Sequence, residues 1–102
     1  MRQPPKLDEV IAILREHEDF YRAKGVTRMA VFGSVARGDS GPDSDVDLVI
    51  DYDPESRFSL LTLCGVQNET SDWLGRKVDM LTWDGLNPRL GRRVRKEAAD
   101  VF

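Results

Sequence analysis

Residues 32–50 read FGSVARGDSGPDSDVDLVI, and this stretch decides both the fold and the place of the chemistry. It connects two β-prone segments, residues 28–32 and residues 46–51, and the second places Val46, Leu48 and Ile50 on one face. Residues 33–44 are rich in Gly, Ser, Asp and Pro, so they allow at most a short helical piece near residues 34–37 before a turn. The stretch predicts a strand, a loop and a second strand, with a candidate functional site in the loop.

Further elements are predicted on both sides of this stretch. Apolar side chains at helical spacing predict helices over residues 7–24 and 58–74, each followed by a glycine that can cap it. Asn87-Pro88 is a start signal for a last helix, whose apolar stripe continues to Val101, and residues 77–81 alternate like a third strand. The order α, β, short α, β, α, β, α predicts an α/β (α+β) fold, in which helices flank a small mixed sheet of about three strands.

Length, charge and cysteine content limit the classes of function. The 102 residues suffice for one domain, 1–102, but not for a second core that could bind a large acceptor, so we expect a partner to supply the acceptor. A formal net charge of −3 argues against direct binding of nucleic acid. The single Cys64, expected to be a buried apolar side chain, and the single histidine exclude an internal disulfide and a four-ligand Cys/His zinc site. No leader-like segment or run of roughly 20 apolar residues is present, so we expect a cytoplasmic protein without a membrane partner.

Gly33-Ser34 ends the first predicted strand and opens the helical piece. Glycine lets a ligand approach the backbone closely, and the first N–H groups of a helix are free donors that a phosphate would accept from. Ser34 adds a hydroxyl donor, and Arg37 would place its guanidinium on a phosphate oxygen. A plain strand-to-helix turn is the alternative for the dipeptide alone. A Walker A loop is excluded, because Asp39 stands where that motif has its lysine.

Asp45 and Asp47 stand two residues apart at the start of the second predicted strand. Their carboxylates leave the same face, and they repel each other unless a cation or a proton intervenes. Magnesium prefers carboxylate oxygens together with substrate phosphates, so the pair is half of a candidate metal site. A calcium loop of the EF-hand type is excluded by Leu48 and Pro54, which stand where it needs Gly and Glu. A solvated acidic loop is the alternative.

Asp79 lies inside the otherwise apolar third predicted strand, where an aspartate is costly to bury without a partner. If this strand neighbours that of Asp47, the three aspartates form a cluster able to hold two metal ions about 3.5–4 Å apart, as in-line phosphoryl displacement requires. An exposed edge strand is the alternative for this residue.

Taken together, these residues resemble a known family. Gly33-Ser34, then ten residues, then Asp45-Val46-Asp47, and a later lone strand aspartate are similar to the minimal nucleotidyltransferase (MNT) family within the polymerase-β-type superfamily. The resemblance implies the nucleotidyltransferase fold, two magnesium ions and ATP as the substrate. It implies that Asp45, Asp47 and Asp79 are the catalytic and metal-binding residues, and that the nucleotide-binding residues are Gly33, Ser34, Arg37 and Ser44.

The resemblance also implies a partner. Many MNT proteins are antitoxins of HEPN-domain RNase toxins, and some transfer AMP from ATP to a tyrosine of the toxin. A magnesium-dependent protein adenylyltransferase with a HEPN toxin as its partner is therefore the expected function. Two alternatives stay open: an antitoxin that acts by binding and occlusion without catalysis, and a nucleotidyltransferase that modifies a small molecule.

The last predicted helix is strongly basic. A solvated helix face is the ordinary reason for such a charge pattern, because arginine is a good helix former. The alternative reasons for this charge pattern are contact with an acidic partner and contact with nucleotide phosphates. The residues concerned are Arg89, Arg92, Arg93, Arg95 and Lys96.

Overall fold

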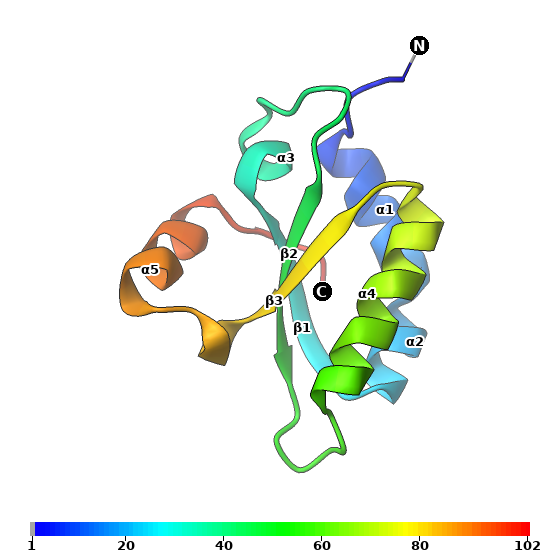
Figure 1. Ribbon diagram of the computed structural model, residues 1–102, viewed down its shortest axis with the longest axis vertical. Coiled ribbons are helices and arrows are strands. Elements are labelled where there is room, and N and C mark those ends of the chain that lie inside the picture. Colours follow the sequence, from blue (N-terminus) through cyan, green and yellow to red (C-terminus); the bar gives the residue numbers. More distant parts are fainter. Residues whose placement is uncertain (1) are drawn as a thin grey trace.

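The computed structural model describes residues 2–102, and its elements follow the predicted order with three additions (Figure 1). The additions are a break in the first helix, a 3-10 turn after the third strand and a short fourth strand. In chain order the elements are α1 (Leu7–Glu16), α2 (Glu18–Ala23), β1 (Val26–Phe32), α3 (Gly33–Arg37), β2 (Val46–Tyr52), α4 (Leu60–Leu74), β3 (Val78–Thr82), the 3-10 turn η1 (Trp83–Gly85), α5 (Pro88–Glu97) and β4 (Ala99–Asp100).

The four strands form one mixed sheet in the order β3-β2-β1-β4. β1 is antiparallel to both β2 and β4, whereas β2 and β3 are parallel. The mixed sheet flanked by helices is confirmed, and the expected number of about three strands is one short. The apolar stripe that continues to Val101 predicted helix here, but Ala98 has extended backbone and Val101 donates a hydrogen bond to the Met29 carbonyl at 2.8 Å. Pairing with β1 therefore ends the helix, and a two-residue strand leaves no periodic signal in the sequence.

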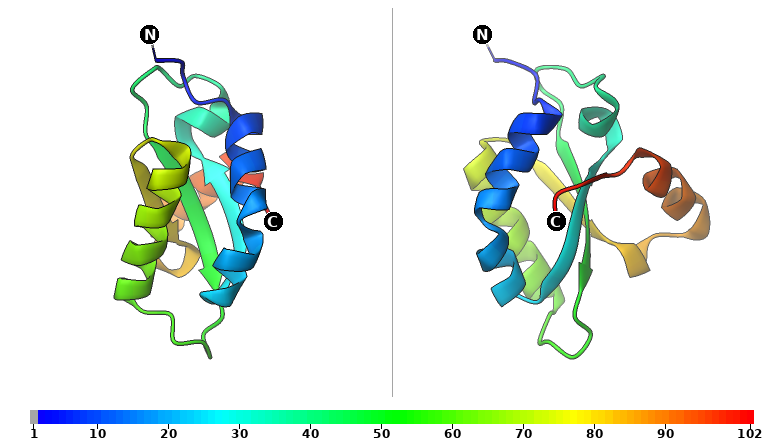
Figure 2. Two further views of the ribbon diagram at one scale, coloured as in Figure 1. Left: turned by 90° about the vertical axis from the view of Figure 1, so that its right-hand side faces the viewer. Right: turned by 180° about the vertical axis from the view of Figure 1, so that it is seen from behind.

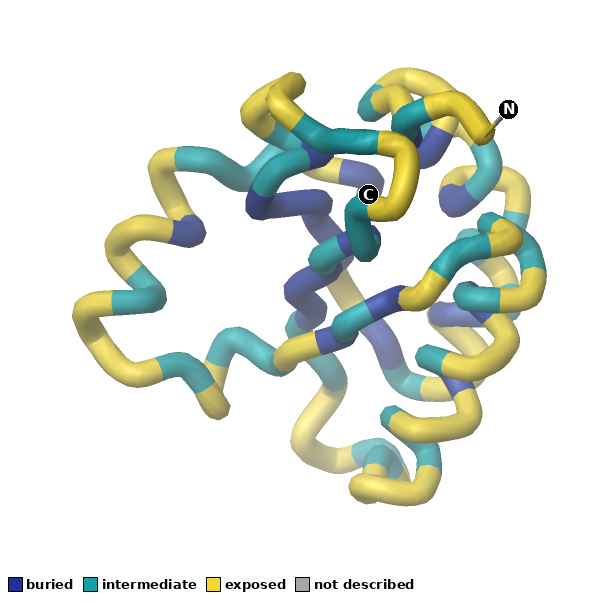
Figure 3. Tube along the Cα trace, turned by 45° about the horizontal axis from the view of Figure 1, so that its top comes forward, coloured by how far each residue is buried: buried dark blue, intermediate teal, exposed yellow. Residues whose placement is uncertain are grey.

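Helices cover both faces of the sheet. Figures 1 and 2 show α1, α2 and α4 on one face and α5 on the other. The larger part of the core lies under α1, α2 and α4, and Val46, Leu48 and Ile50 of β2 belong to it. Val49, on the opposite face of the same strand, packs with Val94 of α5. Figure 3 shows the buried residues concentrated on the strands, with α5 mostly exposed. The residues of β2 that face α5, Asp47 among them, therefore lie on the thinly covered side of the sheet.

The break in the first predicted helix lies at His17. Its backbone has φ −108° and ψ 17°, outside the helical range, and its ring stacks on Trp73 of α4 with centroids 3.6 Å apart. One turn later, the buried Tyr21 hydroxyl lies 2.6 Å from the Thr70 hydroxyl of α4. These contacts with α4 anchor the segment after the break, and they depend on a helix about 50 residues away in the sequence. Local periodicity could not predict the break.

The outer face of α4 is more exposed than its apolar composition suggests. Leu60 and Leu61 are 75% and 84% exposed, and Cys64 is exposed. The expectation that Cys64 is buried was wrong, because it lies on the outward side of the helix. No helix within the described residues has the length and apolar character needed to cross a bilayer.

Candidate active site

The turn from β1 into α3 places a glycine directly against an aspartate. Gly33 has φ +72°, in the left-handed region that favours glycine, and a Cβ atom at this position would collide with the Asp47 carboxylate. Asp47 is the partner of Phe32 across β1 and β2, so the register of the sheet fixes this contact. The candidate phosphate loop and a candidate metal ligand therefore meet at one end of the sheet, and only a residue without a side chain permits the approach.

The three candidate carboxylates gather at the same end of the sheet. Asp47 and Asp79 are direct partners in the parallel pair β2 and β3, and Asp45 lies one residue before β2. Burial raises the pKa of Asp47, and the charges of Asp79 and Asp45 raise it further, whereas Arg37 lowers it. The structure confirms that the strands of Asp47 and Asp79 are neighbours, and the raised pKa of Asp47 reflects burial first and repulsion by Asp79 and Asp45 second.

The donor chemistry of these aspartates suits magnesium, although their side chains do not converge. Within residues 2–102, no three Asp, Glu, His or Cys side chains lie close enough together to hold a metal ion. The Asp45 carboxylate instead lies 3.8 Å from the Lys77 ammonium. Carboxylates without nitrogen or sulfur donors are the set that magnesium prefers, and a divalent cation would neutralise the repulsion felt by Asp47. Magnesium binding by Asp45, Asp47 and Asp79 stays a prediction.

A small cavity of about 280 Å³ lies beside the Gly33 turn, between α3 and α5. It brings together four of the seven predicted site residues, namely Gly33, Ser34, Arg37 and Asp47. Asp45, Asp79 and Ser44 do not line it. The Ser44 hydroxyl oxygen instead accepts a hydrogen bond of 2.7 Å from the Gly41 N–H, which closes the turn before Asp45. Ser44 therefore shapes the loop that leads to the aspartates, and its contact with nucleotide stays a prediction.

Glu97, the last residue of α5, lines the same cavity and was missed in the sequence. Its carboxylate accepts hydrogen bonds from the Gly33 N–H, from Arg37 and from Arg93. Burial raises the pKa of Glu97, but the hydrogen bonds from Arg37, Gly33 and Arg93 together hold it below its ordinary value. The only available signal was the spacing of four between Arg93 and Glu97, and that spacing predicts an ion pair on one helix and not a contact with a distant loop.

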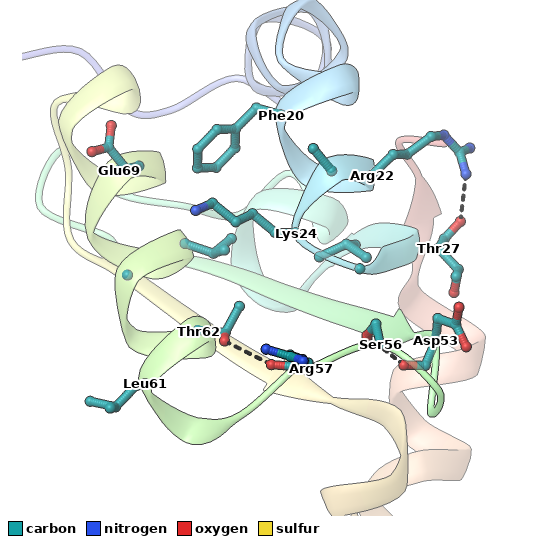
Figure 4. Close-up of a pocket in the computed structure, with 15 residues that line it drawn as sticks. Phe20, Arg22, Lys24, Thr27, Asp53, Ser56, Arg57, Leu61, Thr62 and Glu69 are labelled. Carbon is teal, nitrogen blue, oxygen red and sulfur yellow. Dashed lines mark hydrogen bonds between the residues drawn. The ribbon is translucent and has the colours of Figure 1, made fainter.

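A larger cavity lies elsewhere. It has a volume of about 640 Å³ and is lined by α2, the start of β1, the segment after β2 and the first turns of α4 (Figure 4). None of the predicted site residues lines it. A third cavity of about 580 Å³ lies between part of α5 and the sheet, and Arg28, Asp51 and Trp83 are among the residues that line it. Chemistry and not size therefore identifies the candidate active site, because only the smallest of the three cavities contains the phosphate loop and a metal-type aspartate.

Known proteins match this chain over nearly its whole length. The sequence model of the family described as "Nucleotidyltransferase domain" matches residues 7–101. A protein of Methanocaldococcus jannaschii named as a candidate protein adenylyltransferase is 36% identical over 94 residues, which are 92% of this chain and 91% of that protein. The protein adenylyltransferase MntA of Thermococcus cleftensis is 33% identical over 96 residues, which are 93% of this chain and 95% of that protein.

Solved structures agree with these matches. A structure described as a candidate minimal nucleotidyltransferase has a TM-score of 0.77 and 34% identity, and the match covers 93% of this chain and 95% of that one. A chain in the complex of the tri-AMPylated Shewanella oneidensis HEPN toxin with an MNT antitoxin has a TM-score of 0.61 at 14% identity, covering 94% of this chain and 68% of that one. The second likeness supports the fold alone. The resemblance to minimal nucleotidyltransferases is confirmed, and this chain belongs to the nucleotidyltransferase domain family.

Proposed function

We propose that this chain is a magnesium-dependent protein adenylyltransferase that transfers AMP from ATP to a tyrosine of a HEPN-family toxin and thereby acts as its antitoxin. The observation that carries the proposal is the contact of the Gly33 turn with Asp47, with Asp79 in register beside it. This contact brings the candidate triphosphate loop and two carboxylates together, as transfer of a nucleotidyl group requires.

The residues of the site have separate roles. The Gly33 backbone, the Ser34 hydroxyl and the Arg37 guanidinium bind and orient the triphosphate. Asp45, Asp47 and Asp79 would hold magnesium. When bound, magnesium neutralises the charge of the triphosphate and lowers the pKa of the acceptor hydroxyl.

The chemistry is an in-line displacement at the α-phosphorus. The acceptor tyrosine oxygen forms a bond to the α-phosphorus, and the bond from that phosphorus to the bridging oxygen of pyrophosphate breaks. Pyrophosphate leaves with the bonding electron pair. Asp79 accepts the proton of the tyrosine hydroxyl, because a carboxylate is a suitable general base at this position.

The proposed acceptor follows from the relatives and neighbours. The Thermococcus relative carries the name of a protein adenylyltransferase, and the Shewanella complex contains an AMPylated HEPN toxin with an MNT antitoxin. A protein acceptor also agrees with the shape of the site. The cavity that holds Gly33 and Asp47 is small, so a large acceptor must approach from outside it.

The test incubates the purified chain with ATP labelled at the α-phosphate, magnesium and a HEPN-family toxin from the same genome. We expect AMP on a tyrosine of the toxin by mass spectrometry, and loss of the label with Asp47→Asn and with a tyrosine-to-phenylalanine variant of the toxin. A tight complex with no transferred label would replace this proposal by antitoxin action through occlusion. If the two proteins form no complex and no label is transferred, the result favours a small-molecule acceptor.

A further inference from the structure

Glu97 reaches from the end of α5 into the candidate phosphate loop. Its Oε2 accepts a hydrogen bond of 3.2 Å from the Gly33 N–H. Its Oε1 accepts from Arg37 Nη1 at 3.0 Å and from Arg93 Nε at 3.3 Å. Its side chain is only 16% exposed, whereas the arginine side chains are 37% and 68% exposed. One carboxylate therefore accepts from a backbone donor and a guanidinium of α3 and from a second guanidinium on α5.

The position of Glu97 is unfavourable for a glutamate in other respects. The C-terminus of a helix carries partial negative charge, which disfavours an acidic side chain there. The carboxylate is also largely buried, which is costly for a charge without partners. The three donors offset both costs. Glu97 is thus held in place by the Gly33 N–H and Arg37 of α3 and by Arg93 one turn earlier on its own helix.

The donors around Glu97 are those that a phosphate takes. A backbone N–H at a glycine turn and two guanidinium groups form a site for a planar or tetrahedral oxyanion. Arg37 and Arg93 carry two positive charges at the cavity, and Glu97 and Asp47 carry two negative ones, so an excess positive charge arises there only when Glu97 moves away. A triphosphate brings more negative charge than one carboxylate, and it can satisfy the same donors with more oxygens.

We infer that the Glu97 carboxylate occupies the place of a nucleotide phosphate, that ATP displaces it, and that Arg93 then joins Arg37 as a ligand of the triphosphate. This inference rests on the proposed function, because it takes ATP as the substrate. It makes Glu97 an internal competitor of the nucleotide. The measured affinity for ATP then equals the affinity of the open site multiplied by the fraction of molecules in which Glu97 has moved away, so it is lower than the affinity of the open site.

The inference is tested by calorimetry, which measures the affinity of the full chain for AMP-PNP in the presence of magnesium and without any acceptor. We expect Glu97→Gln to bind about tenfold more tightly, the size of one lost charge-assisted interaction, and Arg93→Gln to bind about tenfold more weakly. Arg92→Gln is the matched control, because Arg92 is the adjacent arginine but lines the separate cavity with Trp83. Its affinity should equal that of the wild type.

The double variant Glu97→Gln/Arg93→Gln separates the two roles. If Arg93 binds nucleotide, its loss weakens binding in the Glu97→Gln background as well. If Arg93 only restrains Glu97, Arg93→Gln alone tightens binding, and the assignment of Arg93 is overturned. Unchanged or weaker binding by a folded Glu97→Gln variant overturns the competitor role.

Two further results keep the outcome clear. If Glu97→Gln does not fold, Glu97→Asp replaces it, because the shorter side chain keeps the charge but withdraws it from the Gly33 N–H, and tighter binding is again expected. A wild-type chain that binds no AMP-PNP overturns the proposed function together with this inference. A wild-type chain that binds AMP-PNP with an affinity insensitive to Glu97 overturns this inference alone.

Discussion

Asp47 and Asp79 are direct partners across the parallel strands β2 and β3, so two carboxylates lie side by side at the end of the sheet that carries the Gly33 turn. Such a pair is unfavourable in a folded protein without a cation. The metal-free chain therefore keeps electrostatic strain at the position where the proposed chemistry takes place.

The first prediction concerns this strain. The pKa of Asp47 is raised in the folded chain, first by burial and then by Asp79 and Asp45. A carboxyl group with a raised folded pKa contributes stability that is fully present below its unfolded pKa and is lost as the pH rises through the folded pKa. Asp47→Asn should therefore stabilise the metal-free chain at neutral pH, by less than about 1 kcal/mol because solvent screens a partly exposed group.

Urea unfolding in a chelator between pH 3 and pH 7.5 measures this effect. The wild type should lose stability relative to Asp47→Asn as the pH rises, and added magnesium should stabilise the wild type but not the variant. Asp51→Asn is the control, because Asp51 lies on the same face of β2 but away from Asp79. Equal pH profiles for the wild type and Asp47→Asn would contradict the repulsion, and magnesium stabilisation of Asp47→Asn equal to that of the wild type would contradict the metal site.

The second prediction concerns the Gly33 turn. Gly33→Ala adds a Cβ atom that collides with the Asp47 carboxylate, and it also forces φ +72° on a residue with a side chain. We expect a loss of about 1–3 kcal/mol of unfolding free energy and loss of AMP-PNP binding. Gly38→Ala is the matched control, since Gly38 has φ +83° but no atom within 4 Å of an added Cβ. It should show the backbone cost, about 1 kcal/mol, and keep nucleotide binding. Equal binding defects in the two variants would remove the role of the contact with Asp47.

The sequence predicted the sheet because its signals there are local. Residues 46–51 are β-prone and place Val46, Leu48 and Ile50 on one face, and the short helical piece ends at a glycine in the left-handed conformation, Gly38. The Asn87 cap was also readable, and its side chain accepts a hydrogen bond from the Leu90 N–H at 2.8 Å. Caps and strand patterns depend on residues within one turn or one strand, so they can be recognised in the sequence without knowledge of the tertiary structure.

The features that were missed depend on contacts between distant segments. The strand at Ala99–Asp100 exists because it pairs with β1, and the helix break at His17 coincides with its stacking on Trp73. The position of Glu97 in the phosphate loop requires α5 to pack beside α3, and no periodicity encodes that packing. The sequence placed Asp79 beside Asp47 only on the condition that their strands are neighbours, because the sequence does not give the order of the strands.

The third prediction concerns the buried contact between α2 and α4. The Thr70 hydroxyl donates to the Val66 carbonyl at 2.8 Å, so the Tyr21 hydroxyl donates to Thr70 at 2.6 Å. Burial raises the pKa of Tyr21 to about 12, so its hydroxyl stays protonated at neutral pH. Tyr21→Phe should lose about 1 kcal/mol of unfolding free energy, because Thr70 keeps its other bond and no buried donor is left unsatisfied.

Thermal unfolding measures this loss, with Tyr52→Phe as the control. The Tyr52 hydroxyl donates to the Asp84 carboxylate at an exposed position, so its removal should change the melting temperature little. Neither variant should alter AMP-PNP binding, because neither tyrosine lines the cavity beside Gly33. A larger loss of stability for Tyr52→Phe than for Tyr21→Phe would contradict the ranking by burial.

The fourth prediction concerns Lys77, whose ammonium lies 3.8 Å from the Asp45 carboxylate. A positive charge at this distance neutralises a proposed metal ligand and repels a second cation. Lys77→Met should therefore lower the magnesium concentration that gives half-maximal AMP transfer, by up to about fivefold, since two charges about 4 Å apart in water interact by roughly 1 kcal/mol. The difference should shrink at high salt, because both side chains are substantially exposed and mobile ions screen them. Lys24→Met, which changes a lysine at the cavity beside α2 and not at the aspartates, is the control for a general change of net charge. An unchanged magnesium requirement in Lys77→Met would mean that Asp45 does not bind the metal, and it would leave Asp47 and Asp79 as the proposed ligands.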